Sequence, residues 1–582
     1  MYNIETENSK TVPRALSLLW PGTHQPDTHC FVIDQTLRKD LELDKLFRYW
    51  AVTDREFMEL ENQLCHISCD PDIINYRQKV MEDMLRFPDL VNCLENILPQ
   101  LEMLKSNQSA DHNKQLEMYK LIDRLGELES YIFCIQELQK AFEKIREEFT
   151  SPAWQRLRQA VDEISCDPAF ISMVTELPDL LAGARAVRSV SIGVNLDRNL
   201  HPCEATLLAI NQERYTGKSA NMFNRILGNN NQKLEGIARL HAVPRKILHT
   251  PAGTTVLDPE IHGYGVNPLM VPLFSDINDV IKKTAAPLSK ALRQFISVNT
   301  VLLGNLKREI AFYLGAYRLI TTIRETGLPF CRPVIRPAAE RRCFIKNSYN
   351  INLVIALLNR KQESVADAVV KNDIRMDEDG RVIILTGLNR GGKTTYLQAI
   401  GLCQILAQLG LPVPGEEAEI SPVDGIYTHF PAEEKIDRGT GRLGDESRRI
   451  STIFSMLTPE SLLLLNESFS STSAGESSYI AAEIVQVLCT LRTRTVFTTH
   501  LYELAYSVDR INGKGRQGNK VVNMIADVSE ETSDSGQRQR TFKIIRGQPT
   551  GNSYAQEIAE RFGVSHKQLT AQLQDRGLLK TI

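Results

Sequence analysis

The chain has 582 residues, more than one hydrophobic core organises, so several domains are expected. Apolar residues make up 42% of the sequence, charged residues 24%, and the formal net charge is −3, which excludes a strongly basic or disordered chain. Any nucleic-acid surface must therefore be a local patch of Lys and Arg. The polar N-terminus lacks a signal core, and no apolar run approaches the roughly 18 residues of a membrane span, so we expect a cytoplasmic protein.

The first long pattern is helical and covers residues 40–148, where Pro and Gly are sparse and apolar residues recur three and four positions apart. Within it, Cys65-His-Ile-Ser-Cys69 comes nearest to a metal-binding pattern, but no second pair of ligands follows. These two cysteines are either part of a metal site or free thiols in a reducing compartment. Because the pair is isolated, free thiols are favoured.

The middle of the chain changes to strand-like patterns at residues 187–196 and 205–211, and the linker between them favours a hairpin or paired strands. Between residues 184 and 246, ten Lys and Arg side chains stand against four Asp and Glu side chains. This segment is either a solvated surface that happens to be basic or a contact surface for nucleic-acid phosphates. A phosphate-contact surface would give affinity for nucleic acid with little sequence preference.

A second helical pattern covers residues 276–326, and Pro287 should start or kink that helix. Three prolines between residues 327 and 337 cannot continue it and predict a domain boundary. Beyond this boundary strands and helices alternate, as expected for a nucleotide-binding α/β domain.

The most specific motif is Gly387-Leu-Asn-Arg-Gly-Gly-Lys-Thr394, which matches the phosphate-loop pattern G-x-x-x-x-G-K-[ST]. Residues 381–386 before it predict a buried strand, and residues 396–406 after it have helical spacing. Such a loop directs backbone N–H groups and the positive end of a helix at phosphates. We therefore expect a bound nucleotide, with Lys393 at its β- and γ-phosphates and the Thr394 hydroxyl on Mg²⁺. An ordinary Gly-rich turn is the alternative.

Two further strands carry polar residues at their ends. Residues 461–468 have the shape of a Walker B strand, with Asn466 where Asp normally orders the Mg²⁺ shell. Glu467 follows where a hydrolytic base or water-positioning carboxylate belongs, although an incidental Glu at the end of a buried strand is the alternative. Residues 493–500 form the next strand and end in His500, which is either structural or a sensor of the γ-phosphate.

A glycine-rich loop at residues 438–446 precedes a predicted helix and lies between the phosphate loop and the Walker B strand. In this position it looks like the signature loop of ABC-type ATPases, and a plain surface turn is the alternative. In that class the loop contacts the nucleotide of the partner subunit. The resemblance would make this protein a dimer with two composite sites.

Several segments together resemble the MutS family. Residues 386–397 are similar to its TGPNMGGKSTYL-type loop, including the Asn and the double Gly. Residues 410–429 resemble its G-x-x-VPA-x-x-AEI…D-x-I-x-T-R block, and residues 498–504 its ATH-x-x-EL. Residues 551–565 resemble the block that leads into its C-terminal dimerising helices. More weakly, residues 190–197 resemble its clamp and residues 70–78 the start of its helical core.

The resemblance implies a multidomain fold, with a mainly α-helical core, lever and clamp followed by an α/β P-loop ATPase of the ABC type. The expected domains are an N-terminal extension (1–39), the core, lever and clamp (40–330), the ATPase (338–545) and a C-terminal helical dimerisation segment (546–582). It also implies ATP and Mg²⁺ as cofactors, a homodimer, and double-stranded DNA as partner, mismatched or branched.

Carried onto matching positions, the family assigns roles to individual residues. The nucleotide is expected at Gly387, Asn389, Gly391, Gly392, Lys393, Thr394 and Thr395, the partner's nucleotide at Gly441, Arg442 and Gly444, Mg²⁺ at Thr394 and Asn466, and hydrolysis at Glu467 and His500. The function implied is an ATP-dependent DNA clamp in mismatch repair or recombination. The alternative is a nucleotide-gated interaction switch that binds ATP and dimerises but hydrolyses slowly, without mismatch recognition.

Three departures from the family pattern qualify these expectations. About forty residues precede the helical core, too few for the family's mismatch-reading domain. Phe57-Met-Glu59 matches the Phe-x-Glu pair of that domain, but it lies in a helical stretch, where a Phe that faces the core is the better account. Asn466 removes a negative charge from the Mg²⁺ site, which predicts slower hydrolysis or a raised Mg²⁺ requirement. In the signature loop, Leu443 and Gly444 replace the usual Ser-Thr, which weakens the expected contact with the partner's nucleotide.

Overall fold

The computed structural model describes residues 16–22, 30–51, 57, 60, 64–104, 117–185, 189–199, 202–211, 213, 247–250, 253–256, 301–388, 390–431, 442–469, 473–514, 520–532, 538–549 and 563–576. The chain forms two compact units, each assembled from several stretches. One takes Met1–Ser17, Phe87–Phe149 and Trp154–Ala311, and the other takes Leu18–Arg86, Thr150–Ala153 and Phe312–Ile582. The domain boundaries expected from the sequence stay a prediction.

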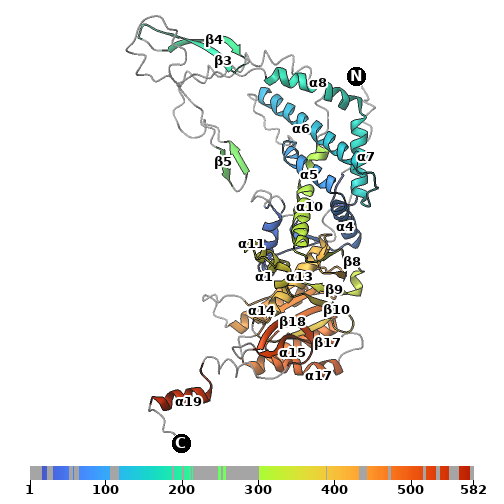
Figure 1. Cartoon of the computed structure of the whole chain (residues 1–582), viewed down its shortest axis with the longest axis vertical. Coiled ribbons are helices and arrows are strands. Elements are labelled where there is room, and N and C mark those ends of the chain that lie inside the picture. Colours follow the sequence, from blue (N-terminus) through green and yellow to red (C-terminus); the bar gives the residue numbers. More distant parts are fainter. Residues whose placement is uncertain are drawn as a thin grey trace, which may run out of the picture. The chain divides into compact units, whose positions relative to one another are not determined.

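The first unit is mainly helical. Its described helices are α5 (Pro88–Leu101), α6 (Glu117–Lys144), most of α7 (Pro152–Ser165), α8 (Pro168–Arg185) and the first part of α10 (Val301–Glu325). Helix α6 packs along both α5 and α8 (Figure 1). Phe149 is the centre of an aromatic cluster in this unit. Its ring centroid lies 5.4 Å from that of Phe87, 5.7 Å from that of Phe142 and 6.5 Å from that of Trp154. In this unit the helical pattern expected up to residue 148 is confirmed over α5 and α6.

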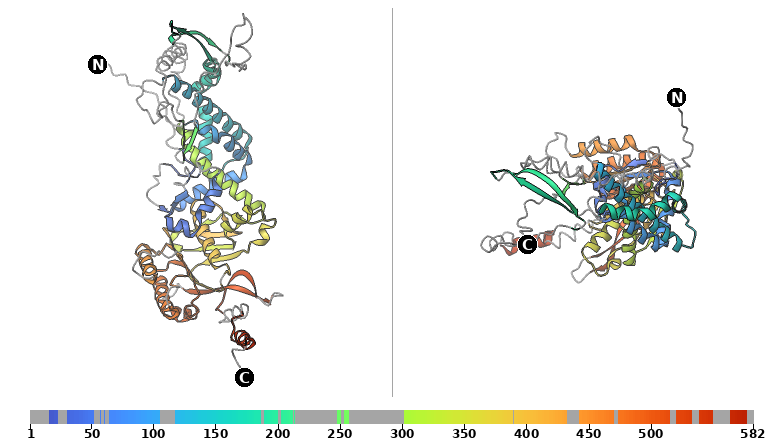
Figure 2. Two further views of the ribbon diagram at one scale, coloured as in Figure 1. Left: turned by 90° about the vertical axis from the view of Figure 1, so that its left-hand side faces the viewer. Right: turned by 90° about the horizontal axis from the view of Figure 1, so that it is seen from above.

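The described residues of the same unit include two antiparallel strand pairs. Strands β3 (Ser189–Leu196) and β4 (Pro202–Asn211) form the hairpin that the sequence predicts, with Ser189 opposite Asn211 (green ribbon in Figure 2). Strands β5 (Ile247–Thr250) and β6 (Gly253–Val256) form a second hairpin, which the sequence patterns did not predict. Residues 214–246 of the basic segment and residues 276–300 of the second helical pattern, Pro287 included, lie outside the described residues.

The N-terminal part of the second unit contains α1 (Gln35–Asp40), α2 (Leu43–Trp50) and α4 (Pro71–Arg86). One correction concerns β2 (His66–Ser68), a strand inside the stretch expected to be helical. It pairs antiparallel with β1 (Cys30–Val32), and this pairing buries Ile67 completely, so a tertiary partner overrides the local pattern. Phe57 is partly buried, and the Arg38 and Arg48 guanidinium groups lie 5.7 and 5.9 Å from its ring centroid, whereas Met58 and Glu59 lie outside the described residues.

Helix α10 contributes its C-terminal part to the second unit, where it packs closely against Trp50. The indole Nε1 donates a hydrogen bond to the carbonyl oxygen of Phe312 at 2.7 Å. Gly315 makes this approach possible, because a Cβ there would lie 2.0 Å from Cδ1 of Trp50. Helix α10 ends at Glu325, where the proline-rich segment was predicted to stop it.

A six-stranded sheet organises the rest of the second unit. Its order is β14 (Ile426–His429), β15 (Leu462–Asn466), β16 (Arg494–Thr498), β11 (Val382–Thr386), β17 (Val521–Thr532) and β18 (Arg538–Arg546). All pairs are parallel except β17 with β18. A four-stranded sheet of β10 (Asn372–Met376), β9 (Cys343–Ser348), β13 (Glu417–Ile420) and β8 (Val334–Ile335) accompanies it, as does the short pair β12 (Val413–Pro414) and β7 (Phe330–Cys331).

Helices cover both faces of the six-stranded sheet, and the apolar strands are buried on both sides. Helix α13 (Lys393–Gln408) packs on β15 and β16, and a Cβ on its Gly401 would lie 3.0 Å from the Leu464 side chain. The opposite face packs on α14 (Arg442–Met456), α15 (Ala474–Leu491), α16 (Tyr502–Tyr506) and α17 (Val508–Lys514). Among the described residues of this unit, the remaining helical elements are η4 (Ala338–Glu340), α11 (Ile351–Asn359), α12 (Val365–Ala368) and α19 (His566–Asp575). The described fold is therefore a mixture of helical and α/β structure.

Arg494 ties the amino end of the central strands to three surrounding loops. Its guanidinium is fully buried and donates to the carbonyl oxygens of four residues, Arg342, Ser421, Pro422 and Glu460, at 2.8–3.3 Å. Burial lowers the pKa of this group to about 10. Carbonyl dipoles of the backbone therefore stabilise this cation, at the edge of the six-stranded sheet opposite the phosphate loop.

The described part of the chain lacks both a membrane-spanning helix and a cluster of metal ligands. No helix there is sufficiently long and apolar to traverse a bilayer. Nor do those residues contain three or more His, Cys, Asp or Glu side chains grouped to hold a metal ion. Cys65 and Cys69, the pair nearest to a metal pattern, are partly buried thiols.

Candidate nucleotide-binding site

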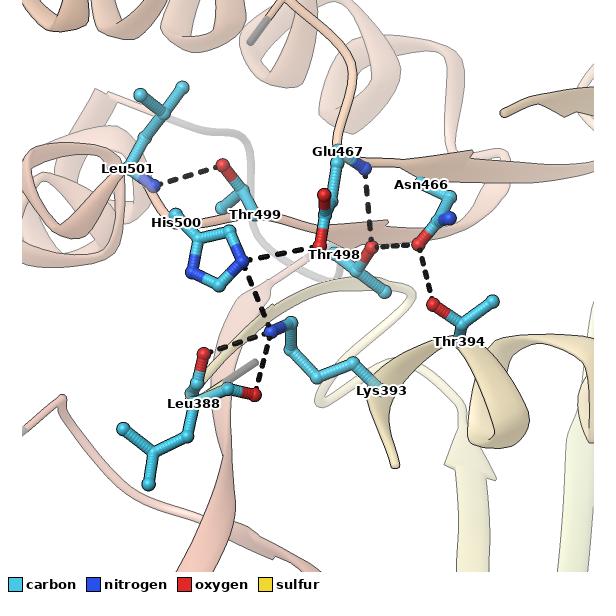
Figure 3. A network of polar contacts seen from close by, with 10 residues as sticks. Leu388, Lys393, Thr394, Asn466, Glu467, Thr498, Thr499, His500 and Leu501 are labelled. Atoms are coloured by element: carbon cyan, nitrogen blue, oxygen red, sulfur yellow. Dashed lines mark hydrogen bonds and ion pairs between the residues drawn. The ribbon is translucent and has the colours of Figure 1, made fainter. Parts of the chain in front are cut away.

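Three adjacent parallel strands, β15, β16 and β11, end at the same edge of the six-stranded sheet. The phosphate loop follows β11, Asn466 and Glu467 stand at the end of β15, and His500 follows β16. Because parallel strands present their carboxyl ends together, residues from three distant parts of the sequence meet there (Figure 3). The predicted strand, loop and helix around residues 381–406 are all present.

The loop geometry requires glycine at two of the predicted positions. Gly387 has φ +139°, and a Cβ there would lie 2.7 Å from Cβ of Ala526 on the neighbouring strand β17. Gly392 has φ +90° and caps the N-terminus of α13. Both values lie where L side chains are strained, so glycine lets the backbone turn directly into the helix. The N–H groups of the first turn of α13 and the positive end of its dipole therefore face the loop.

Lys393 is folded back against its own loop. Its Nζ donates to the carbonyl oxygens of Gly387 at 2.8 Å and Leu388 at 3.1 Å, and lies 3.4 Å from Nε2 of His500 (Figure 3). The residue is only 5% exposed, and this burial lowers the pKa of its ammonium to about 8, against the opposing effect of Glu467. The ammonium is thus held at the centre of the loop by neutral carbonyl groups.

Asn466 connects the phosphate loop with two strands. Its Oδ1 accepts hydrogen bonds from Oγ1 of Thr394 at 3.2 Å and from Oγ1 of Thr498 at 2.7 Å. Asn466 lies opposite Thr498 in the parallel register and is 7% exposed. Two hydroxyl oxygens and an amide oxygen, all uncharged, therefore gather beside the N-terminus of α13.

Glu467 and His500 form a partly exposed pair, with Nε2 of the imidazole 3.2 Å from Oε1 of the carboxylate. The hydrogen bond from His500 is the largest influence that lowers the pKa of Glu467. Glu467 has φ +49°, a left-handed conformation that turns the chain sharply after β15, and its N–H donates to the Thr498 carbonyl oxygen at 2.9 Å. A carboxylate that stays ionised, an imidazole and the Lys393 ammonium thus share one edge and can position water and anionic groups.

The predicted site residues divide into three groups. The first group is held together by contacts between its side chains and consists of Lys393, Thr394, Asn466, Glu467 and His500. Gly387, Gly391 and Gly392 shape the loop, and Thr395 lies in the first turn of α13. Arg442 and Gly444 lie at the start of α14, a different element, whereas Asn389 and Gly441 lie outside the described residues.

Thr498 was not among the residues predicted from the sequence. It is fully buried and is the second hydroxyl that holds the Asn466 amide. The only local signal is a polar residue at the end of a buried strand. The contact itself depends on the β15–β16 register, which no local pattern reveals.

Comparison with known families gives two matches. The description "MutS domain V" matches residues 383–574, which include the phosphate loop, Asn466, Glu467 and His500. The description "MutS2 N-terminal domain" matches residues 69–326. The two matches do not overlap and lie on either side of the proline-rich segment at residues 327–337.

Curated relatives are similar over part of the chain. A DNA mismatch repair protein MutS of Chlorobium phaeovibrioides is 37% identical over 200 residues, which are 34% of this chain and 22% of the relative. The protein of the same name from Chlorobaculum tepidum is 36% identical over 236 residues, 40% of this chain and 25% of the relative. That from Petrotoga mobilis is 37% identical over 168 residues, 29% of this chain and 20% of the relative. The similarity thus spans a quarter or less of each of these relatives.

Proposed function

Because this chain belongs to the MutS family, we propose that it is an ATP-dependent DNA-binding protein that works as a dimeric clamp with composite ATPase sites in mismatch repair or recombination. In this proposal the domains follow the boundaries expected from the sequence: residues 40–330 act as core, lever and clamp, 338–545 as a P-loop ATPase of the ABC type, and 546–582 as a dimerisation segment. The protein would act in the cytoplasm on double-stranded DNA.

The observation that carries the ATP part is the meeting of five polar side chains at the end of α13, namely Lys393, Thr394, Asn466, Glu467 and His500. On binding ATP, Lys393 would exchange its carbonyl partners for phosphate oxygens, a charge-assisted interaction that is stronger than the neutral ones it replaces. Main-chain N–H groups at the N-terminus of α13 would hold the same phosphates.

The side-chain oxygens of Thr394 and Asn466 are suitable ligands for Mg²⁺ or for its bound water, because Mg²⁺ prefers hard oxygen ligands and retains several waters. When bound, the metal would neutralise charge on the phosphates. Since Asn466 contributes no negative charge, the protein should hold Mg²⁺ mainly through the phosphates of the nucleotide and hydrolyse ATP slowly. Glu467 would orient the attacking water, with His500 fixing the carboxylate and sensing the γ-phosphate.

The DNA part of the proposal rests on the family and on charge. The basic segment at residues 184–246 carries six more positive than negative side chains. It includes the β3–β4 hairpin, on which Val194, Leu196 and Leu208 are 51%, 53% and 67% exposed. A basic segment with an exposed two-stranded ribbon suits contact with phosphates and the edge of a groove.

A second function is favoured by one observation, the neutral amide at Asn466. In this alternative the protein binds ATP, dimerises and hydrolyses rarely, as a nucleotide-gated interaction switch without mismatch recognition.

Binding of the full chain to homoduplex, mismatched and four-way-junction DNA, with and without ATP and at two salt concentrations, tests the proposal. The Lys393→Ala variant controls for the role of nucleotide. We expect ATP-dependent DNA binding that weakens with salt, because phosphate contacts release counterions. ATP-dependent dimerisation without DNA binding would instead support the switch, and loss of ATP binding by the unsubstituted protein would refute both.

A further inference from the structure

Helix α14 places a carboxylate where its pattern calls for an apolar residue. Leu443, Ile450 and Ile453 of this helix pack in the core beneath the six-stranded sheet. Glu446 lies on the same stripe, three positions after Leu443 and four before Ile450, and is 9% exposed. A carboxylate at such a position costs stability unless its oxygens are hydrogen-bonded. Its contacts therefore indicate what it does.

Glu446 accepts a hydrogen bond from the main chain beside the candidate catalytic carboxylate. Its Oε2 lies 2.9 Å from the backbone nitrogen of Phe469, two residues after Glu467. Phe469 is 1% exposed and has φ +65°, and Glu467 has φ +49°. Two non-glycine residues in the left-handed region within three positions are held only where surrounding contacts determine the backbone.

Two further side chains hold the same turn from other elements. The Ser477 hydroxyl of α15 donates to the Phe469 carbonyl oxygen at 2.6 Å. His429, at the end of β14, places its Nδ1 2.7 Å from Oγ of Ser468. Burial lowers the pKa of His429 to about 4, so this imidazole is neutral at physiological pH. The turn after β15 is thus held by buried polar side chains from α14, α15 and β14.

We propose that Glu446 is a positioning residue for ATP hydrolysis: by holding the Phe469 N–H, it fixes the turn that aims the Glu467 carboxylate. The inference rests on the proposed ATPase function of this site. It also gives α14 a second role, because the helix that begins at Arg442 and carries Gly444 is joined through Glu446 to the hydrolytic carboxylate. A shift of α14 on engaging the partner's nucleotide would move Glu467.

The test uses the full-length protein with Glu446→Ala, Glu446→Gln and the matched control Glu483→Gln, an exposed carboxylate on α15. Three quantities are measured: the dissociation constant of a fluorescent ATP analogue, the single-turnover rate of ATP hydrolysis at saturation, and amide exchange in peptides spanning residues 467–469. Thermal unfolding monitors folding of each variant.

We expect E446A to bind the analogue within about twofold of the unsubstituted protein while hydrolysing at least about tenfold more slowly, since only the aim of Glu467 changes. Amide exchange at Phe469 should rise in E446A. E446Q should recover much of the rate, because an amide oxygen still accepts from the Phe469 N–H. E483Q should behave as the unsubstituted protein.

The possible contrary results separate the two claims. Unchanged turnover in E446A with ATP binding intact would overturn the positioning role, as would equal losses of affinity and rate in both Glu446 variants. If E446A does not fold, E446Q decides: a rate no better than about a tenth of the unsubstituted one, with normal affinity, would refute the hydrogen bond as the cause. Absence of ATP binding in the unsubstituted protein would instead overturn the proposed function itself.

Discussion

The Thr394 hydroxyl donates a hydrogen bond to Oδ1 of Asn466 at 3.2 Å, and so joins the end of the phosphate loop to the end of β15. The two residues are 72 positions apart in the sequence. The amide oxygen also accepts a hydrogen bond from the Thr498 hydroxyl. Two hydroxyl groups therefore hold the Asn466 side chain at the position where a Walker B strand normally carries an aspartate. The neutral amide of Asn466 thus has hydrogen-bond partners on both α13 and β16.

Asn466→Asp is expected to lower the Mg²⁺ concentration needed for half-maximal ATP binding by about tenfold, equivalent to about 1.4 kcal/mol. It should also raise the hydrolysis rate. The reason is that a carboxylate retains the acceptor for both hydroxyl groups and adds a negative charge beside the metal. Titration of nucleotide binding against Mg²⁺ measures the effect, with Asn359→Asp as an exposed control. An unchanged Mg²⁺ midpoint would show that charge at residue 466 does not limit metal binding.

Lys393→Met should weaken ATP binding by about 10- to 100-fold, because the charge-assisted contacts with phosphate are lost. It should also change stability with pH. The folded pKa of Lys393 is lowered from 10.5 to about 8 by burial, so the unfolded chain binds more protons between these values. The contribution of Lys393 to stability therefore rises with pH in this window and is least favourable below pH 8.

Urea unfolding of the nucleotide-free protein at pH 7 and pH 10 checks this second effect. The stability of K393M relative to the unsubstituted protein should be higher at pH 7 and should decrease towards pH 10. Lys520→Met, at a 62% exposed side chain, serves as control. A difference that is independent of pH would contradict a buried ammonium with a lowered pKa.

His500→Ala should reduce the rate of hydrolysis at saturating ATP by about 10- to 100-fold and change ATP affinity far less. Its imidazole is the main group that lowers the pKa of Glu467. Without it the Glu467 carboxylate is protonated more readily, so the acid limb of the pH–rate profile should move to higher pH. Single-turnover rates between pH 5 and 8, compared with the exposed control His66→Ala, measure the shift. An acid limb that stays in place would exclude Glu467 as the group that titrates.

Arg494→Met should lower the free energy of unfolding by about 3 kcal/mol or more. Four carbonyl oxygens lose the guanidinium as donor in a fully buried place. Those of Arg342 and Ser421 still accept from the Ser421 N–H and from Nε2 of Gln404, so the loss falls mainly on those of Pro422 and Glu460, at about 1–3 kcal/mol for each unsatisfied group. Chemical denaturation measures the change. The control is Arg448→Met, whose exposed ion pair with Asp445 should contribute less than about 1 kcal/mol. A loss in R494M as small as in R448M would mean that the loops around residue 494 rearrange at little cost.

The sequence alone determined the chemistry available at the site. A phosphate loop needs glycine at Gly387 and Gly392 for its backbone and a lysine for its charge, and these local requirements are readable as a motif. The apolar runs before Asn466 and His500 were sufficient to predict two more buried strands with polar ends. The β3–β4 hairpin was likewise visible in the alternation of the chain.

The tertiary structure decided which of these residues meet. Strand order places β16 between β15 and β11, and the register sets Thr498 opposite Asn466. Order and register follow from packing of the whole core, which a local pattern does not contain. The same holds for Glu446, whose position in a helical stripe predicts an apolar contact and whose carboxylate accepts a hydrogen bond from the Phe469 N–H. Local sequence specifies what each residue can do, and long-range packing specifies with which partner it does so.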